Sequence, residues 1–377
     1  MDDRNKREKI CRCNFIDYKR AFEISDRNIL INKLFLYGLR GNVLKWFKNY
    51  VSDRKQRTYV NGVMSDEREV NYGVPQGSVL GPILFILYIN DLKQFIGQHC
   101  EIRMFVDDTM LYVTEKSMDR MEQKLNSVMS HLDNWMSNNN MFLNTKKTFY
   151  MILKNDQMQM DRDLTIKYRN VTIERAREIK YLGVFLDECL KFKKHVSYVE
   201  GIVGSKLGLL NRVGNFVGPY TRDLIYKTMI APHMEYCSTV LLYANQEEIE
   251  RFQKLQNRAM RIILHCDIYT PTRDMRSILN YLSIDERIKR NVLILIFKMV
   301  RGIITPEMCD RIEYVGNRTG RLTRQSNHIA VPFKRTLTAQ KSIFFKGFKM
   351  FNELPADYRN IMNLDTFRRR LREYILD

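Results

Sequence analysis

The sequence predicts an α+β fold. Short runs of aromatic and β-branched residues, typical of buried strands, alternate with longer stretches whose apolar residues recur at helical spacing. A chain of 377 residues is long enough for two or three compact units. No apolar run has the length needed to cross a bilayer, and the first nine residues lack the apolar segment of a secretory signal. We therefore expect a protein that is neither secreted nor inserted in a membrane.

The most informative predicted strands end in acidic residues. Asp17 follows a short aromatic and β-branched run, and Asp107 and Asp108 interrupt an apolar run on both sides. We expect two buried strands to form a hairpin around this second site, with the two acids at its tip. Adjacent carboxylates repel one another unless a cation compensates them. Three carboxylates at strand ends are the ligand set of a Mg²⁺ pair in phosphoryl or nucleotidyl transfer, whereas Asp-Asp by itself is also common in solvated turns.

Between these acidic sites the pattern is mainly helical. Helices are predicted over residues 27–37 and 43–51, where apolar residues share one face. Residues 58–63 indicate a strand and a turn. The stretch 78–89 is apolar on nearly every side, so we expect a helix buried within the domain.

After the acidic hairpin we expect a long amphipathic helix capped by Ser117. Seven apolar residues at helical spacing define its core-facing side: Met121, Leu125, Val128, Met129, Leu132, Trp135 and Met136. This face is interpreted as core rather than as a functional surface.

From about residue 190 the pattern is almost entirely helical. One predicted helix has an apolar face of five residues, Ile249, Phe252, Leu255, Ala259 and Ile263. Its other side carries four cations that either bind nucleic acid or are simply solvated, Arg251, Lys254, Arg258 and Arg261. A final helix is predicted with Asp365 as its N-cap, and its basic residues interleave with aromatic ones, which suits phosphate neutralisation with base stacking.

The overall charge predicts a polyanionic partner. Lys and Arg number 62 against 43 Asp and Glu, a formal net charge of +19, so we expect salt-dependent binding to nucleic acid. The seven cysteines are scattered without paired spacing, which favours a reducing compartment. Four residues come nearest to a set of zinc ligands: His233, Cys237, His265 and Cys266. Their spacing is not that of a zinc knuckle, so we interpret them as core residues or as residues without a role in metal binding.

Seven motifs occur in order along the first half of the chain: FIDYKRAF (15–22), YGLRG (37–41), WFKNYVSDRKQRTYVNG (46–62), GVPQGSVLGPILFILYINDL (73–92), FVDDT (105–109), LNTKKT (143–148) and YLGVFLD (181–187). In this order they resemble the reverse transcriptases of non-LTR retrotransposons, the jockey and CR1 type in particular. The resemblance implies a right-hand polymerase palm with partial fingers over residues 1–190. It also implies a helical thumb over 191–280 and a basic C-terminal extension over 281–377.

The resemblance assigns the three acids to catalysis. Asp17 and Asp107 would bridge two Mg²⁺ ions, with Mn²⁺ as an alternative metal, and Asp108 would be the third, less central acid. The implied reaction is RNA-directed DNA synthesis, in which dNTPs are added to the 3′-hydroxyl of a DNA primer on an RNA template. The implied location is the nucleus, where the family copies RNA at a chromosomal nick, with the cytoplasm as the alternative.

The resemblance also implies substrate-binding residues. Phe22 would stack under the incoming sugar and select deoxynucleotides, unless it is an ordinary core residue. Gln76 and Gly77 would position template and nucleotide, since the amide donates and accepts and glycine permits close backbone approach. Lys147 would stabilise the leaving pyrophosphate, with a surface lysine as the alternative.

A predicted primer grip completes the site. It comprises Tyr181, Leu182 and Gly183, which would seat the primer end; an ordinary strand is the alternative.

Two features depart from the family pattern. Only sixteen residues precede Asp17, so we expect an N-terminally truncated enzyme without the basic fingers residues that clamp the triphosphate. Glu23 replaces the Asp that usually follows the aromatic residue. The alternative to an active polymerase is therefore a catalytically inactive nucleic-acid-binding remnant.

Overall fold

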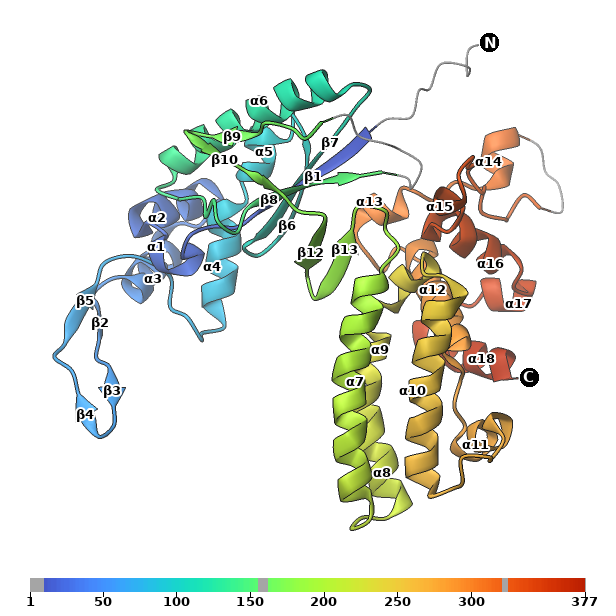
Figure 1. The fold of residues 1–377 in the computed structure, drawn as a ribbon. Coiled ribbons are helices and arrows are strands. Elements are labelled where there is room, and N and C mark those ends of the chain that lie inside the picture. Colours follow the sequence, from blue (N-terminus) through green and yellow to red (C-terminus); the bar gives the residue numbers. More distant parts are fainter. Residues whose placement is uncertain (1–9, 155–161, 321–324, 377) are drawn as a thin grey trace. The chain divides into compact units, whose positions relative to one another are not determined.

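The computed structural model describes residues 10–154, 162–320 and 325–376 (Figure 1). The chain divides into two compact units, a first unit of residues 1–182 and a second unit of residues 183–377. The first unit combines a five-stranded sheet with helices, and the second is built mainly from helices. The predicted α+β class is confirmed. The finer division at residues 190 and 280 stays a prediction.

The sheet of the first unit has the strand order β11-β8-β1-β7-β6. Its central strand β1 pairs antiparallel with β7 and β8, β6 pairs antiparallel with β7, and β11 pairs parallel with β8. The strands are β1 (Ile10–Ile16), β6 (Glu101–Phe105), β7 (Asp108–Glu115), β8 (Phe149–Leu153) and β11 (Glu174–Arg175). β6 is an edge strand whose residues alternate between buried and accessible, so only one face of the predicted hairpin is buried.

The described part of the first unit has six helices: α1 (Ala21–Ile24), α2 (Arg27–Leu36), α3 (Gly41–Val51), α4 (Leu80–Ile89), α5 (Leu92–Ile96) and α6 (Met118–Asn138). The long helix α6 packs against β7 (Figure 1) and buries all seven residues of its predicted apolar face. The Ser117 hydroxyl accepts a hydrogen bond from the backbone N–H of Arg120, as expected of an N-cap.

Helix α4 is less buried than its composition predicts. Leu84, Phe85 and Tyr88 are buried against the core, but Ile83 and Ile86 are 48% and 44% exposed. The expectation of a helix buried within the domain therefore holds for one side of α4 only. The side of α4 that is buried packs chiefly against α2 among the described elements, and uniform hydrophobicity cannot reveal which side that is.

Short two-stranded ribbons complete the first unit. They are β2 (Arg54–Gln56) with β5 (Arg68–Val70), β3 (Tyr59–Val60) with β4 (Val63–Met64), and β9 (Lys167–Tyr168) with β10 (Val171–Thr172). Asn61 and Gly62 form the β3–β4 turn, and both have a positive φ, as a two-residue hairpin turn requires. The strand and turn predicted over residues 58–63 are confirmed.

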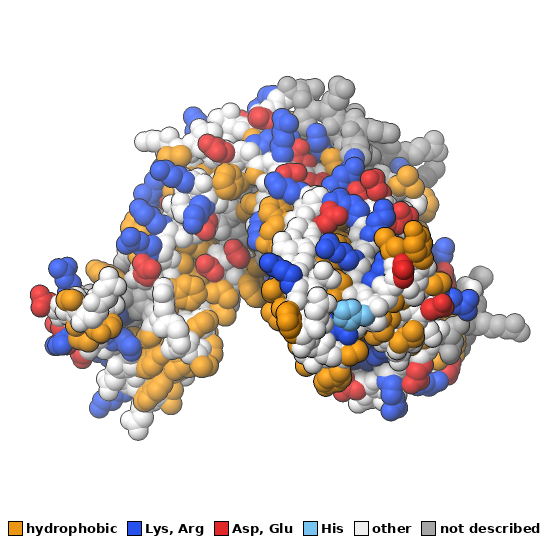
Figure 2. Space-filling view, turned by 60° about the horizontal axis from the view of Figure 1, so that its bottom comes forward, with side chains coloured by type: hydrophobic (Ala, Val, Ile, Leu, Met, Phe, Trp, Pro, Cys, Tyr) orange, Lys and Arg blue, Asp and Glu red, His pale blue; other side chains and the backbone are white. Residues whose placement is uncertain are grey.

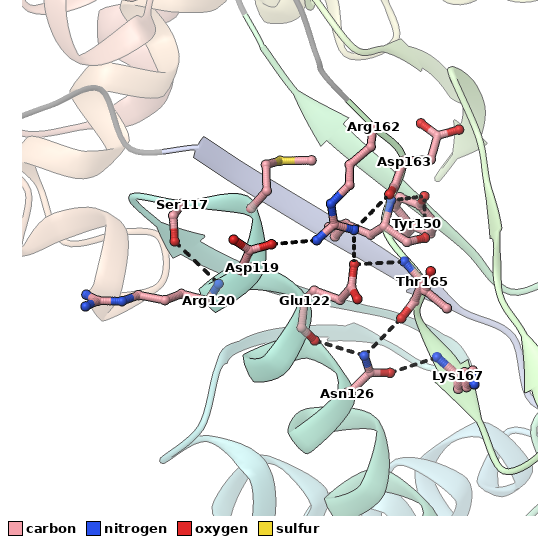
Figure 3. Close-up of polar contacts among 12 residues, drawn as sticks. Ser117, Asp119, Arg120, Glu122, Asn126, Tyr150, Arg162, Asp163, Thr165 and Lys167 are labelled. Carbon is pink, nitrogen blue, oxygen red and sulfur yellow. Dashed lines mark hydrogen bonds and ion pairs between the residues drawn. The ribbon is translucent and has the colours of Figure 1, made fainter.

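A polar network holds the segment before β9 against α6 (Figure 3). The guanidinium of Arg162 donates to Asp119 at 2.7 Å and to Glu122 at 2.6 Å. Glu122 also accepts from the backbone N–H of Thr165, and Asn126 bonds the backbone of Thr165 and of Lys167. These bonds fix the chain that leads into β9 along the exposed side of α6.

The β12–β13 ribbon, β12 (Glu178–Tyr181) and β13 (Val184–Asp187), contains the boundary between the units. The helices of the second unit are α7 (Lys193–Gly214), α8 (Pro219–Ile225), α9 (Ala231–Glu235), α10 (Gln246–Leu264), α11 (Thr272–Leu279), α12 (Ile284–Val300), α13 (Pro306–Cys309), α14 (Val315–Thr319), α15 (Leu337–Gln340), α16 (Phe348–Asn352), α17 (Ala356–Arg359) and α18 (Leu364–Leu376). Residues 226–230 and 343–347 form π-helical turns, and residues 238–242 form a 3₁₀ turn.

The core of the second unit surrounds α12, which packs against α10, α16 and α18. A capping box of Ser283 and Glu286 begins this helix. The rings of Phe297 and Phe367 stack with centroids 4.1 Å apart, which joins α12 to α18. Helices α7 and α10 lie side by side (Figure 1).

The apolar face predicted for α10 is buried in this core, with Leu255 partly buried. On the other side of α10, Arg251 pairs with Glu200 of α7, so this cation is used within the unit. Lys254 and Arg258 are exposed.

The N-cap predicted for the last helix is wrong. The side chain of Asn363, not that of Asp365, accepts from the backbone N–H groups of Asp365 at 2.9 Å and Thr366 at 3.0 Å. Asp365 lies in the first turn and pairs with Arg368. Both residue types cap helices well, so composition alone could not separate them.

Within the described part of the chain, none of the helices is long and apolar enough to span a membrane. The seven cysteines are free thiols.

Candidate active site

The three predicted catalytic acids lie at one edge of the central sheet. In the antiparallel register of β1 and β7, Ile16 faces Thr109. Asp17 therefore follows the last paired residue of β1, and Asp108 precedes its partner on β7. Asp107 lies in the two-residue turn between β6 and β7, where Val106 has a positive φ of 56°. The acids that the sequence predicts to converge thus come from neighbouring strands.

Their charges act on one another. Partial burial raises the pKa of Asp108, and the negative charges of Asp107 and Asp17 raise it further. Burial also raises the pKa of Tyr18, with a smaller contribution from Asp107. The Tyr18 hydroxyl lies 3.1 Å from the Thr109 hydroxyl, a buried hydrogen bond that joins the two strands beside the acids.

Carboxylate oxygens are the ligands that Mg²⁺ prefers. A cation bound at this edge of the sheet would relieve the repulsion among the carboxylates of Asp17, Asp107 and Asp108. Within residues 10–154, 162–320 and 325–376, however, no three His, Cys, Asp or Glu side chains form a group that could hold a metal ion. The donor set therefore fits Mg²⁺ in its chemistry, but the side chains are not arranged as a finished coordination site.

Backbone contacts hold Asp17 next to the loop that contains Lys147. The Asp17 carbonyl accepts from the N–H of Asn144 at 2.9 Å, and its own N–H donates to the Thr148 hydroxyl at 3.3 Å. Lys147 is exposed in the turn between these two contacts. Thr148 is fully buried and was not predicted as part of the site, since a threonine before a strand has no distinctive signal.

Phe22 lies on α1, five residues after Asp17. Its ring packs against Phe85 with centroids 4.6 Å apart, and the side chain is half-buried. Its backbone carbonyl accepts from the N–H of Val74 at 2.9 Å. The contact ties the segment that contains Gln76 to the helix that follows Asp17.

Gly73 makes this attachment possible. It has a φ of +80°, and a Cβ placed on it would lie 2.6 Å from the Phe22 carbonyl oxygen and 2.7 Å from that of Glu23. Gln76 and Gly77 follow in an exposed turn. Gly77 has a φ of +75°, and a Cβ there would meet nothing within 4 Å, so its side is open to a ligand.

A cavity of about 600 Å³ adjoins Gln76, and three cations line it: Arg27, Arg54 and Lys55. The guanidinium of Arg27 is occupied, because it donates to the backbone carbonyls of Val70, Tyr72 and Gly73. Lys55 pairs with Glu67 at 2.9 Å. The sequence interpretation missed these basic residues, although the DRKQR run at residues 53–57 was a visible signal.

The predicted primer grip lies in the β12–β13 ribbon. Tyr181 packs edge-on against Phe15 of β1, with centroids 5.3 Å apart. Burial raises the pKa of Tyr181, and the charge of Asp108 contributes, so this side chain lies near the acids. Leu182 and Gly183 form the turn with φ values of 46° and 80°.

Basic side chains do not by themselves define a binding surface. On the face drawn in Figure 2, Lys and Arg are spread among acidic and hydrophobic side chains rather than gathered in one patch.

Comparison with solved structures finds telomerases of low similarity. Apo telomerase from Candida tropicalis matches with a TM-score of 0.36 and 13% identity, covering 81% of this chain and 52% of that one. The same enzyme in complex with a fragment of telomeric RNA matches with a TM-score of 0.33 and 12% identity, covering 74% of this chain and 50% of that one.

Comparison of sequences is more informative. The 115 kDa protein of type-1 retrotransposable element R1DM of Drosophila melanogaster is 27% identical, covering 67% of this chain and 24% of that protein. The "Probable RNA-directed DNA polymerase from transposon BS" of the same species is 27% identical over 75% of this chain and 32% of its own length. The RNA-directed DNA polymerase from its mobile element jockey is 24% identical over 64% and 27%.

The chain thus spans about a quarter to a third of the length of these three relatives. The family described as "Reverse transcriptase (RNA-dependent DNA polymerase)" matches residues 2–186, which contain all three aspartates and the other predicted site residues. This chain therefore contains a reverse transcriptase domain over residues 2–186, and its sequence is similar to those of RNA-directed DNA polymerases of non-LTR retrotransposons.

Proposed function

We propose that this chain carries out RNA-directed DNA synthesis, adding dNTPs to the 3′-hydroxyl of a DNA primer on an RNA template. The observation that carries the proposal is the position of Asp17, Asp107 and Asp108 at one edge of the sheet, on adjacent strands of a reverse transcriptase domain. The family generally uses divalent metal ions.

Asp17 and Asp107 would hold two Mg²⁺ ions, with Asp108 beside them and Mn²⁺ as the alternative metal. Bound there, the metal pair would favour ionisation of the primer hydroxyl and neutralise the leaving pyrophosphate. Burial raises the pKa of Asp108 most, and the charges of Asp107 and Asp17 raise it further; these two charges support the assignment, because negative charge gathers where cations are needed.

Other residues would position the substrates. Phe22, which lies five residues after Asp17 and packs on Phe85, would lie under the sugar of the dNTP. Gln76 and Gly77 would contact template and nucleotide from an exposed turn whose backbone is open on the Gly77 side. Lys147, in a loop bonded to the Asp17 backbone, would reach the triphosphate.

The remaining parts would hold the nucleic acid. Tyr181, Leu182 and Gly183 would seat the primer end, supported by the contact of Tyr181 with Phe15. Residues 191–280 would act as the thumb and 281–377 as a basic extension. We place the activity in the nucleus by analogy with the family, with the cytoplasm as the alternative.

A second candidate is a nucleic-acid-binding protein without catalysis. One observation favours it: the three aspartates do not form a metal-holding group within the described residues. Positioning and charge neutralisation supply nearly all of the catalysis in phosphoryl transfer, so a chain whose acids did not gather metal ions would bind nucleic acid without reacting.

Primer extension on poly(rA)/oligo(dT) with Mg²⁺ separates the two candidates. We expect the wild-type chain to extend the primer and Asp107→Asn to abolish extension with nearly unchanged template binding. Asp66→Asn is the matched control, because Asp66 is an exposed aspartate outside the predicted site.

Salt-sensitive binding by the wild-type chain without any extension would support the binding protein. Loss of both extension and binding in Asp107→Asn would mean that this residue is structural.

A further inference from the structure

A polar cavity of about 470 Å³ lies within the second unit, in the part that follows α12. We propose that it binds one nucleotide, with the phosphate on Arg301 and Arg359 and the base against Tyr314 and neighbouring asparagine amides. The nucleotide belongs either to a single strand or to a free mononucleotide. All described residues that line the cavity belong to the second unit, so the proposal does not depend on polymerase activity.

The walls of the cavity are fixed by backbone pairing. Residues 313–316 and 326–330 run antiparallel, with the N–H of Val315 bonded to the carbonyl of His328 and the N–H of Gly316 bonded to that of Ser326. A Cβ on Gly316 would lie 3.0 Å from the Ser326 Cβ and 3.2 Å from its carbonyl oxygen, so glycine permits this close approach. The side chain of Asn352 on α16 then holds this pairing by two hydrogen bonds to the backbone of Ile329.

Hydrogen bonds to backbone carbonyls orient the guanidinium groups of Arg301 and Arg359 at the cavity, and these bonds use only some of the N–H donors of each group. Arg301 donates through Nε to the Ile361 carbonyl at 3.0 Å and through Nη2 to the Arg359 carbonyl at 2.7 Å. Arg359 donates through Nε to the Leu354 carbonyl at 3.0 Å. Nη1 of Arg301 and both Nη atoms of Arg359 have no acceptor among the residues that the structure describes.

The electrostatics favour an anion. The twelve described residues that line the cavity include Arg301 and Arg359 but no aspartate or glutamate. The positive charge of Arg359 acts on its surroundings, since burial and this charge together lower the pKa of His328. Guanidinium forks match the oxygens of a phosphate group.

The rest of the lining suits a nucleobase. Asn317, Asn327 and Asn360 are exposed at the cavity, and no hydrogen bond to another described residue engages their amides. Each amide can donate and accept, as the polar edge of a base requires. Tyr314 supplies a half-buried ring on which a base can stack.

These features select a nucleotide over other ligands. The volume falls in the range of about 300–1,000 Å³ that is typical of small-ligand pockets. A metal ion would lack acidic ligands among the described residues that line the cavity. A base can enter only when it is unpaired, so a duplex is disfavoured.

The test is photocrosslinking of the full chain to a short single-stranded RNA containing 4-thiouridine, with the labelled peptides mapped by mass spectrometry. We expect label at Tyr314 or the adjoining lining residues with the single strand and little label there with a duplex of the same sequence. Label confined to residues outside the cavity would overturn the proposal.

Arg359→Gln should reduce the cavity label by about tenfold, the size of one lost charge-assisted contact. Arg369→Gln is the matched control, because Arg369 is an exposed arginine of the same unit that does not line the cavity. Equal loss in both variants would mean general electrostatic attraction and would contradict a built site. Asn327→Leu, which leaves the Arg359 bonds intact, should also reduce the label.

Competition identifies the source of the nucleotide. Displacement of the label by AMP supports a free mononucleotide, and persistence against AMP supports a nucleotide within a strand. Displacement by inorganic phosphate as effective as that by AMP would overturn the nucleotide assignment. The Asp107→Asn protein should keep the cavity label, so failure here and failure of the polymerase are distinguishable.

Discussion

Replacing Gly73 with alanine should destabilise the first unit strongly, because two separate effects add at this position. The first is backbone conformation: a φ of +80° costs a residue with a Cβ about 1–2 kcal/mol. The second is steric, since the new Cβ would lie 2.6 and 2.7 Å from two carbonyl oxygens of the α1 turn.

The steric effect can be relieved only by moving backbone. Such a movement would strain the hydrogen bonds from Val74 to Phe22 at 2.9 Å and from Gly73 to Ser25 at 2.8 Å. Each buried group left unpaired costs about 1–3 kcal/mol. We therefore expect Gly73→Ala to lower the free energy of unfolding by about 3–5 kcal/mol in total.

Gly62→Ala is the matched control. Gly62 has a φ of +84°, but a Cβ there would meet nothing within 4 Å, so only the conformational cost of about 1–2 kcal/mol applies. The assay is denaturant unfolding followed by tryptophan fluorescence, because both tryptophans, Trp46 and Trp135, lie in the first unit. Losses that agree within about 0.5 kcal/mol would refute the steric argument.

Three further predictions concern other sites. Phe22→Ala should permit ribonucleotide incorporation in primer extension with rNTPs, and no gain would remove Phe22 from the sugar site. Burial lowers the pKa of His195 from 6.5, so this side chain is harder to protonate in the folded state than in the unfolded state. The free energy of unfolding should therefore fall as the pH drops below 6.5, by at most about 1.4 kcal/mol per pH unit. His195→Met should reduce this slope in circular-dichroism titrations, whereas an unchanged slope would exclude His195 as its source. Ser283→Ala removes the cap of α12 and should cost about 1 kcal/mol in thermal unfolding, and a neutral outcome would mean that packing alone begins the helix.

Periodicity was a reliable guide where a helix has one buried side. The seven apolar residues of α6 and the face of α10 were predicted correctly because a 3.6-residue repeat maps directly onto one side of a helix. The repeat is absent in α4, which is apolar on nearly every side, and there the predicted burial within the domain holds for one side only. Burial of a charged residue is another feature that the hydrophobic pattern did not predict. Arg12 in β1 is fully buried, and burial lowers its pKa to about 10.

The sequence alone determined the reverse transcriptase motifs, their order and the strand-end positions of the acids. Only the tertiary structure decided that Asp17 and Asp108, about ninety residues apart, meet at one edge of the sheet, since strand register depends on pairing between distant segments. It also decided the cationic lining beside Gln76 and the polar cavity around Arg359. The local sequence encodes which backbone conformation a segment prefers, whereas a functional site depends on which side chains are brought together by packing between distant segments.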